Sequence, residues 1–321
     1  MKILITGGSG FIGTNLLEKF VRYGYDVVNI DFQKPRNMDF EKYWRNIDIT
    51  NFTDFQSEVN SFNPDYIVHL AARTDLNGSN MNDYSANTLG VQNLMKIVKN
   101  LQSLKKVLIT SSMLVCKLGY QPKDDFDFNP STIYGESKVL SEMYVRENQP
   151  LCDWSILRPT SIWGPWFREP YKIFFDMIIH KKYFHIGNRG CTKTYGYIKN
   201  ATYQIEKILF TNTIENRSKV FYLGDYEETN IEVWANKIGL ELGLSIKKVP
   251  YFLVKFLAIF GDILKTININ FPMTSFRLKN MTTSNTIDLS NTKEIAPNLP
   301  SNRENSIKQT LSWLKTQKTE R

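Results

Sequence analysis

The fold is decided near the start of the chain, by the stretch Thr6-Gly7-Gly8-Ser9-Gly10-Phe11-Ile12-Gly13. The residues before it, 2–5, read Lys-Ile-Leu-Ile, which is typical of a buried strand. After it, apolar residues recur at helical spacing from Leu16 to Val21. A strand, a glycine turn and an amphipathic helix in this order predict the first unit of a dinucleotide-binding fold.

Glycines at three of these positions carry the phosphate-binding interpretation. Gly7, Gly10 and Gly13 permit a tight turn and let the backbone approach a pyrophosphate. The N–H groups at the start of the following helix, near Phe11 and Ile12, then face the anion. We therefore expect the cofactor to bind this loop through all five residues.

A carboxylate follows the next predicted strand. Residues 27–30 read Val-Val-Asn-Ile and lead into Asp31, close to the ~20-residue offset at which a dinucleotide fold places an acid on the adenosine ribose. This carboxylate would accept bonds from both ribose hydroxyls and repel a 2′-phosphate, which favours NAD over NADP. Lys34 and Arg36 are near enough to reach a phosphate, but we favour the interpretation that they belong to a solvated loop.

The second chemical signal is Tyr134-Gly135-Glu136-Ser137-Lys138. Residues four apart share a helix face, so the ammonium of Lys138 is expected beside the phenol of Tyr134. A free tyrosine has a pKa of about 10, and a fixed cation lowers that pKa by favouring the phenolate. The pair predicts a proton-transfer site. A surface helix with a half-buried aromatic ring is the alternative interpretation.

Composition and patterning extend the fold prediction to the whole chain. The 321 residues are 42% hydrophobic, enough to bury a large core. Strand-like runs alternate with helical patterns, and these runs are 3–6, 27–31, 66–70, 106–111 and 154–158, with helices notably at 84–101 and 133–148. We predict an α/β protein with a Rossmann-type doubly wound parallel sheet. The predicted division is an NAD-binding domain at 1–160, carrying the proton-transfer pair, and a smaller substrate-binding lobe at 161–321.

Several classes of partner are disfavoured. The net charge is +8, but the basic residues are dispersed and form no basic-aromatic nucleic-acid motif. Three scattered cysteines, Cys116, Cys152 and Cys191, give no metal-ligand spacing and fit a reducing cytoplasm. A core strand follows Met1 at once, so we expect no secretory signal before it.

One strongly apolar stretch, 250–264, stands apart. It is shorter than the ~20 residues that span a bilayer, and Lys255 and Asp262 interrupt it. We predict a core or subunit-interface helix there. Peripheral contact with a membrane is the lesser alternative.

Further motifs follow in order along the chain. They are Asp48-Ile49-Thr50, His69-Leu70-Ala71-Ala72, Asn87, Thr110-Ser111-Ser112, Tyr134 with Lys138, Leu157-Arg158-Pro159 and Gly164-Pro165. Together with the glycine loop, they resemble the extended short-chain dehydrogenase/reductase family, in its nucleotide-sugar epimerase/dehydratase branch. The resemblance covers about the whole chain and thins after Asp225.

This resemblance implies NAD as the cofactor. Asp48 and Ile49 would cover the adenine, and Ala71 and Ala72 would line the nicotinamide side. Lys138 would also bond the nicotinamide ribose. The remaining implied cofactor contacts are Leu70 and Pro159.

The resemblance also selects a catalytic hydroxyl. The family places its Ser or Thr three residues before a Val or Ile, and Val115 fixes that frame, so Ser112 is our choice and Ser111 the second. Related 4,6-dehydratases carry an Asp-Glu pair after this hydroxyl, and 3,5-epimerase/reductases carry a cysteine. Met113 and Leu114 stand there instead. The chemistries that remain are 4-epimerisation, 4-keto reduction and 4-dehydrogenation.

For the second lobe the resemblance implies a site for a nucleotide-diphosphate sugar. Candidate contacts, each with ordinary packing as the alternative, are Thr74, Ser161, Trp163, Trp166, Phe167, His185, Arg189, Lys193 and Tyr195. Lys193 stands near the family's diphosphate-binding arginine and keeps its charge without its bidentate fork. The predicted helices 84–101 and 133–148 resemble the pair that forms a homodimer interface in the family.

The leading hypothesis is an NAD-dependent nucleotide-sugar C4 epimerase of surface polysaccharide biosynthesis, acting in the cytoplasm. A 4-keto reductase or 4-dehydrogenase is the runner-up. A hydroxysteroid-type dehydrogenase and a non-catalytic NAD-binding scaffold are further alternatives, because a fold does not fix a function.

Overall fold

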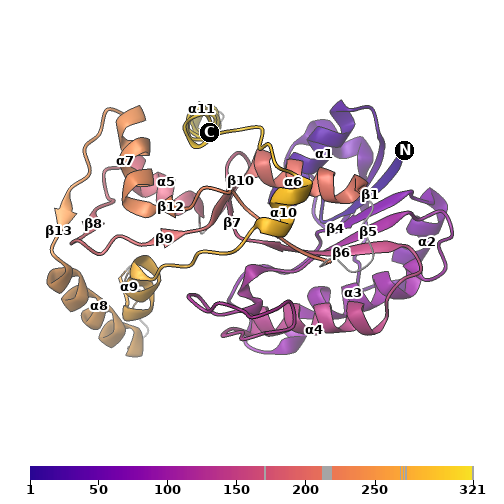
Figure 1. Cartoon of the computed structure of the whole chain (residues 1–321), viewed down its shortest axis with the longest axis horizontal. Helices are drawn as coiled ribbons and strands as arrows, with labels where there is room; N and C mark the ends of the chain where they lie inside the picture. The colour runs from indigo at the N-terminus through magenta and orange to yellow at the C-terminus, as the bar shows by residue number, and fades with distance from the viewer. Residues whose placement is uncertain (170, 212–218, 268, 270, 272, 320–321) are drawn as a thin grey trace.

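A seven-stranded parallel sheet forms the centre of the molecule. The computed structural model describes residues 1–169, 171–211, 219–267, 269, 271 and 273–319. The strand order is β11-β6-β5-β4-β1-β2-β3, and every neighbouring pair is parallel. Helices cover both faces of the sheet, and a smaller lobe extends from one end (Figure 1). The predicted α/β class and Rossmann-type doubly wound sheet are confirmed.

The strands of this sheet are β1 (Lys2–Thr6), β2 (Asp26–Asp31), β3 (Trp44–Asn46), β4 (Tyr66–His69), β5 (Lys106–Thr110), β6 (Asp153–Pro159) and β11 (Val220–Leu223). The five predicted strands agree with β1, β2, β4, β5 and β6 to within one residue at each end. The pattern does not predict the edge strands. β3 has three residues after the 3₁₀ turn η1 (Met38–Tyr43), and β11 returns to the sheet from the second half of the chain.

Each face of the sheet has its own hydrophobic core. On one face, α1 (Phe11–Arg22) and α6 (Ile198–Phe210) bury apolar side chains such as Phe20 and Ile205. On the other face, α2 (Phe52–Phe62), α3 (Ser85–Val98) and α4 (Ile133–Glu147) do the same. The helices predicted at 84–101 and 133–148 are confirmed as α3, which follows the 3₁₀ turn η2 (Met81–Tyr84), and α4.

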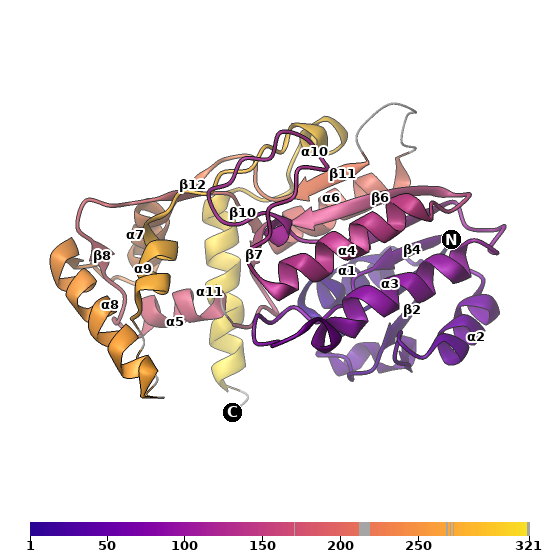
Figure 2. The same cartoon turned by 90° about the horizontal axis from the view of Figure 1, so that it is seen from below.

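Helices α3 and α4 pack closely through small polar side chains. Asn87 Nδ2 donates to Ser137 Oγ at 2.9 Å, and Ser141 Oγ donates to the Asn87 carbonyl at 2.6 Å. Figure 2, which looks onto this face of the sheet, shows the two helices side by side. These bonds fix the helix that carries Tyr134 and Lys138.

The smaller lobe is built mainly from residues after 160. Its strands form the pairs β7 (Ser161–Trp163) with β10 (Tyr195–Tyr197), β9 (Thr192–Lys193) with β12 (Thr229–Asn230), and β8 (His185–Ile186) with β13 (Lys248–Val249). Its helices are α5 (Tyr171–Ile179), α7 (Ile231–Glu241), α8 (Tyr251–Thr266), α9 (Ser275–Thr282) and α11 (Arg303–Thr319). The last of them, α11, closes the lobe.

Some later segments return to the first domain. Strand β11 and helix α6 belong to the large sheet, and α10 (Ser290–Ile295) packs against both of them. The division at residue 160 stays a prediction, and these segments are its exceptions.

Helix α8 covers the apolar stretch for which the sequence predicts a core or interface helix. The core alternative is wrong. In α8, Val254, Ala258 and Gly261 are buried, whereas most of the large apolar side chains are exposed. Among the described residues, no helix has the length and apolar content that crossing a bilayer requires.

A buried ion pair ties α4 to the sheet. Arg158 on β6 donates from Nε and Nη2 to the two carboxylate oxygens of Glu142, both at 2.8 Å, and each side chain is 1% exposed. Arg158 also donates to Tyr222 Oη and to the Asp125 carbonyl, both at 2.9 Å. The pair is therefore fully hydrogen-bonded, the condition under which a buried charge is tolerated.

Removing one partner of this pair predicts a large loss of stability. Glu142→Ala leaves the Arg158 guanidinium buried without its counter-charge, so the free energy of unfolding should fall by about 3–5 kcal/mol. Urea unfolding followed by circular dichroism measures this loss. Glu147→Ala, at an exposed position of the same helix, is the control and should change stability by less than about 0.5 kcal/mol. A similar small change for Glu142→Ala would contradict the structural role of the pair.

Candidate active site

The glycine loop joins β1 to α1 with no room for side chains at two positions. Gly7 has a φ of +73°, and a Cβ there would lie 2.5 Å from the backbone nitrogen of Ala71. A Cβ on Gly13 would clash with the carbonyl oxygen of Gly7. The loop therefore forms a bare backbone cradle beside the end of β4, which fits the close approach of a dinucleotide pyrophosphate.

The N-terminus of α1 is electrostatically suited to a bound anion. Gly10 is the N-cap, and no acidic residue lies in the first turn. The first N–H groups of a helix, here those of Phe11, Ile12 and Gly13, have no partner within the helix and carry the positive end of its dipole. They form an anion site at the edge of the cradle.

Asp31 lies at the end of β2, next to this loop. Its carboxylate accepts from Ser9 N at 3.1 Å and from Gln33 N at 2.9 Å. Burial raises the pKa of Asp31, and these backbone bonds offset part of the effect. The position suits the ribose contact that the sequence predicts.

Arg36 is not part of a solvated loop, so that interpretation is wrong for this residue. Its Nε donates to the Ser9 carbonyl at 3.1 Å, and its Nη1 donates to the carbonyl of Trp166. Burial, aided by the nearby Arg168, lowers the pKa of Arg36 to about 10. Arg36 thus connects the glycine loop to the second lobe. Lys34 is exposed, with Glu41 3.8 Å away.

The remaining implied cofactor contacts differ in exposure. Asp48 is exposed, and its Oδ1 accepts from Thr50 N at 2.8 Å. The side chain of Ile49 packs in the core against Gly90. Partly buried positions at the carboxyl ends of β4 and β6 are Leu70, Ala71, Ala72 and Pro159. All of these cofactor contacts stay predictions.

The structure brings Ser112 and Tyr134 together. Ser112 Oγ accepts from Leu114 N at 3.1 Å, capping the 3₁₀ turn η3 (Met113–Val115), and its hydroxyl lies close enough to Tyr134 to oppose the rise in the pKa of that phenol. Ser111 is buried, and its hydroxyl has no partner among the described residues. Ser112 is therefore the hydroxyl that faces Tyr134 at the carboxyl end of β5.

Lys138 does not act on Tyr134 as the spacing predicts. Its Nζ donates to the Thr110 carbonyl at 2.9 Å, and burial lowers the pKa of Lys138 to about 8. Burial also raises the pKa of Tyr134 to about 12, despite the nearby hydroxyl of Ser112. The expectation of a lowered tyrosine pKa is wrong for the protein by itself, because desolvation of the phenolate dominates.

His69 is a buried neighbour that the sequence does not single out for chemistry. Its Nδ1 lies 2.8 Å from Thr6 Oγ1, and Ala71 N donates to the same hydroxyl at 3.2 Å. Burial, with the charge of Lys138, lowers the pKa of His69 to about 3. A neutral imidazole therefore links the ends of β1 and β4.

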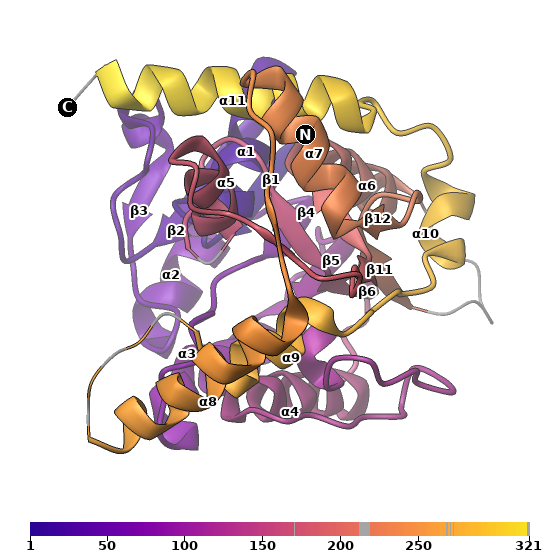
Figure 3. The ribbon, with the colours of Figure 1, turned by 90° about the vertical axis from the view of Figure 1, so that its left-hand side faces the viewer.

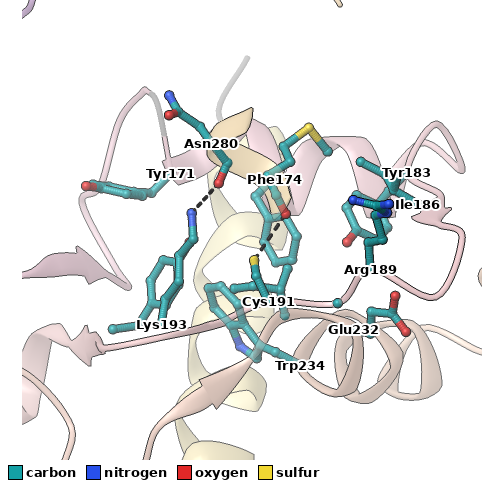
Figure 4. Close-up of a pocket in the computed structure, with 14 residues that line it drawn as sticks. Tyr171, Phe174, Tyr183, Ile186, Arg189, Cys191, Lys193, Glu232, Trp234 and Asn280 are labelled. Carbon is teal, nitrogen blue, oxygen red and sulfur yellow. Dashed lines mark hydrogen bonds between the residues drawn. The ribbon is translucent and has the colours of Figure 1, made fainter. Parts of the chain in front are cut away.

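A cavity of about 220 Å³ lies in the second lobe. In Figure 4, Tyr171 and Lys193 lie toward one end, and Arg189 and Glu232 toward the other. Tyr171 donates to Ser161 Oγ at 3.2 Å, and it is one of the neighbours that raise the pKa of Tyr134. Tyr171 is thus the lining residue that relates the cavity to Tyr134.

Three of the predicted substrate contacts line this cavity. They are Arg189, Lys193 and Tyr195. Lys193 Nζ donates to the Asn280 carbonyl at 2.6 Å, and burial lowers the pKa of this lysine. The Arg189 guanidinium lies 4.1 Å from the ring centroid of Tyr251, a cation–π contact.

Other predicted contacts have structural roles instead. Trp163 and Phe167 are buried in an aromatic core, and Trp166 packs against Trp313 of α11. His185 Nε2 lies 2.9 Å from Asn236 Oδ1. These four residues pack within the protein and do not line this cavity, whereas Thr74 lies exposed after β4, and their contact with a substrate stays a prediction.

Several cavity residues have no signal in the sequence. They are Tyr171, Phe174, Tyr183, Ile186, Cys191, Ile231, Glu232, Trp234 and Met281. Among the described residues, Glu232 Oε1 and Trp234 Nε1 are buried without a hydrogen-bond partner. These two cavity-lining residues therefore each keep one polar atom that is unpaired within the described part of the chain.

Comparisons with known proteins show which proteins this chain is similar to. The sequence model of the NAD dependent epimerase/dehydratase family matches residues 3–189. The chain is 29% identical over 183 residues to a UDP-glucose 4-epimerase of Mycolicibacterium smegmatis, covering 51% of this chain and 57% of that protein. It is 26% identical over 256 residues to the N-acetyl-alpha-D-glucosaminyl-diphospho-ditrans,octacis-undecaprenol 4-epimerase of Escherichia coli O157:H7, covering 77% and 73%. The solved UDP-glucose 4-epimerase of Thermotoga maritima has the same fold, with a TM-score of 0.75, 18% identity and 99% of both chains covered.

The buried Lys138 predicts a pH-dependent stability. Its folded pKa is about 8 and its ordinary value 10.5, so between these values the unfolded chain binds more protons and stability rises with pH. Lys138→Met removes the cost of burying the ammonium. After the lost bond to Thr110 is counted, the variant should be roughly 1–3 kcal/mol more stable near neutral pH.

The difference between variant and wild type should shrink as the pH rises from about 8 toward 10.5. Urea unfolding of both proteins across this range isolates the contribution of the lysine. A variant that is less stable than the wild type at neutral pH would contradict the prediction.

Proposed function

Because the chain belongs to the NAD-dependent epimerase/dehydratase family, we propose that it is a C4 epimerase of nucleotide-linked sugars. It is an enzyme of the extended short-chain dehydrogenase/reductase type, and NAD is its cofactor. The proposal concerns the substrate and the net reaction.

One observation carries the proposal. Ser112 lies beside Tyr134 at the end of β5, and Met113 and Leu114 follow it on η3. Neither of these side chains can carry a proton, so the turn adds no second acid or base to the Ser112–Tyr134 pair. This arrangement therefore suits a reaction at a single carbinol carbon with a single proton-transfer group, such as 4-epimerisation.

Each side chain has a defined task in the proposed reaction. Tyr134 takes the proton of the C4 hydroxyl and later returns it, and Ser112 holds the C4 oxygen by a hydrogen bond. Bound NAD+ would accept the hydride that leaves C4, and its positive ring would favour the phenolate that burial alone disfavours. Lys138, held by the Thr110 carbonyl, would bond the nicotinamide ribose. The sugar would turn over as the 4-ketone, so that the hydride would return to C4 on its other face.

The cavity supports a substrate that contains a diphosphate. Arg189 and Lys193 line it together with several aromatic side chains, which suits a polyanion joined to a planar or apolar group. Burial lowers the pKa of Lys193. A bound diphosphate would favour its charged form again.

The proposed setting is surface polysaccharide biosynthesis in the cytoplasm. The relatives act, by name, on a nucleotide-linked sugar and on an undecaprenol-linked diphospho-sugar. Cys116, Cys152 and Cys191 are free thiols, in keeping with a reducing compartment.

The experiment that tests the net reaction is a product screen. The protein is incubated with UDP-, GDP-, CDP- and dTDP-sugars, with and without added NAD+, and products are analysed by mass spectrometry and NMR. An epimerase yields an isobaric product and consumes no cofactor. A product that differs by two hydrogens would replace this proposal with a 4-keto reductase or 4-dehydrogenase.

Tyr134→Phe should remove activity without removing the fold. The ring still packs against Tyr84, whose centroid lies 6.0 Å away, but the proton path is lost. Turnover of the sugar identified in the screen should fall by about 10²–10⁴. NAD affinity, measured by calorimetry, should change little. Near-normal turnover would favour the non-catalytic scaffold instead.

We also propose a homodimer through α3 and α4. Leu140 and Met143 on the outer side of α4 are 47% and 44% exposed, and Leu89 on α3 lies exposed as well. Leu140→Glu with Met143→Glu should therefore halve the mass measured by light scattering. Leu151→Glu, at an exposed apolar position outside these helices, is the control. A wild type that is monomeric at micromolar concentration would refute the dimer.

A further inference from the structure

Helix α8 presents its most apolar side outward. Val254, Ala258 and Gly261 form the buried side, whereas Phe252, Phe256 and Ile263 are 67%, 69% and 58% exposed. Positions 252, 256, 259 and 263 follow the spacing of one helix face. This orientation is the reverse of an ordinary surface helix, whose apolar stripe faces the core.

The exposed side continues beyond this row. Its members, here called the α8 face, are Phe252, Phe256, Ile259, Phe260, Ile263 and, on the neighbouring α9, Phe276. Figure 3 looks at this end of the molecule and shows α8 and α9 lying together there. A contiguous apolar surface of this kind marks an interaction site.

The α8 face is held in place by the lobe beneath it. Val254 and Ala258 of α8, Leu278 of α9 and Ile186 of β8 form a separate small core. Asp262 Oδ1 accepts from Ser275 N at 3.1 Å, which joins α8 to the start of α9. The outward aromatic side chains are therefore carried on a packed helix pair.

The charges around the α8 face have one dominant sign. Residues 242–287 contain six basic residues, Lys247, Lys248, Lys255, Lys265, Arg277 and Lys279, against the single acid Asp262. All six basic side chains are exposed. An apolar aromatic face bordered by cations is typical of a helix that lies in the interface of an anionic bilayer.

We propose that the α8 face docks the protein on an anionic phospholipid bilayer. The 16 residues of α8 are fewer than the ~20 that span a bilayer, so the helix lies parallel to the membrane surface. The phenylalanines enter the acyl boundary, and the lysines meet the lipid phosphates. The charge of the whole chain, +8, adds a long-range attraction of the same sign.

A second copy of the chain fits the α8 face less well. A two-fold symmetric contact brings the same patch of both subunits together, so the six basic residues of each copy would face one another. Like charges across an interface oppose association. An anionic lipid surface satisfies the apolar face and the charges at once.

The α8 face also lies next to the candidate substrate cavity. Arg189 lines the cavity and stacks on Tyr251, the first residue of α8, and Met281 of α9 lines it too. Docking therefore brings the second lobe, and with it the cavity, to the membrane surface.

Sedimentation with lipid vesicles tests the proposal. The full chain should bind vesicles of phosphatidylcholine with about one-third phosphatidylglycerol, and bind pure phosphatidylcholine much more weakly. Phe252→Asp with Phe256→Asp should lower the partition coefficient about tenfold or more. Lys255→Glu with Lys265→Glu should reduce binding to the anionic vesicles toward the level of the neutral ones.

The matched control replaces two exposed leucines elsewhere, Leu151→Asp with Leu240→Asp, and should bind like the wild type. Thermal unfolding should show that all variants are folded. Equal vesicle binding by Phe252→Asp with Phe256→Asp would overturn the proposal. The proposal would also be overturned if the wild type does not bind vesicles and Phe252→Asp with Phe256→Asp lowers the mass measured by light scattering. That result would assign the α8 face to a second copy of the chain. Turnover of a water-soluble nucleotide sugar without vesicles should be unchanged in these variants, so the epimerase proposal is tested separately.

Discussion

The absence of side chains at Gly7 and Gly13 is the constraint on which the site depends. It lets the start of α1 sit against the loop and lets the loop sit against Ala71 after β4. With any larger residue at these positions, the helix start would move away from the ends of β1 and β4. The N-terminus of α1 and Asp31, whose carboxylate accepts from Ser9 N of the loop, are both positioned by this contact.

Much of the nucleotide-binding half can be predicted from the sequence, because its signals are local. The glycine loop follows one buried strand, Asp31 ends the next, and each strand of the sheet interior is an apolar run of its own. The edge strands β3 and β11 lack such a signal. A hydropathy pattern does not predict the contact of α3 with α4 either, because Asn87, Ser137 and Ser141 make this contact through hydrogen bonds.

The sequence predicts which residues belong to the candidate site but not the direction of their pKa shifts. The family resemblance selects Ser112, the helical spacing with Lys138 selects Tyr134, and the structure places these two residues close together. Spacing says nothing about burial, which decides the direction of the pKa of Tyr134. Nor does it separate an aromatic side chain in a core, such as Trp163, from one that lines a cavity, such as Trp234. The cavity draws on α5, α7, α9 and the segments between them, so its members meet only after folding.

Helix α4 makes different contacts on its different faces. Tyr134, Lys138 and Glu142 lie along one line at spacings of four, the first two in the site and the third in the ion pair with Arg158. Ser137 and Ser141 lie against α3. Only the outward side of α4 has none of these contacts and can vary in evolution. A deep mutational scan of this helix would show tolerated substitutions on that side alone. In a dimer formed through α4, even fewer positions on that side would tolerate substitution.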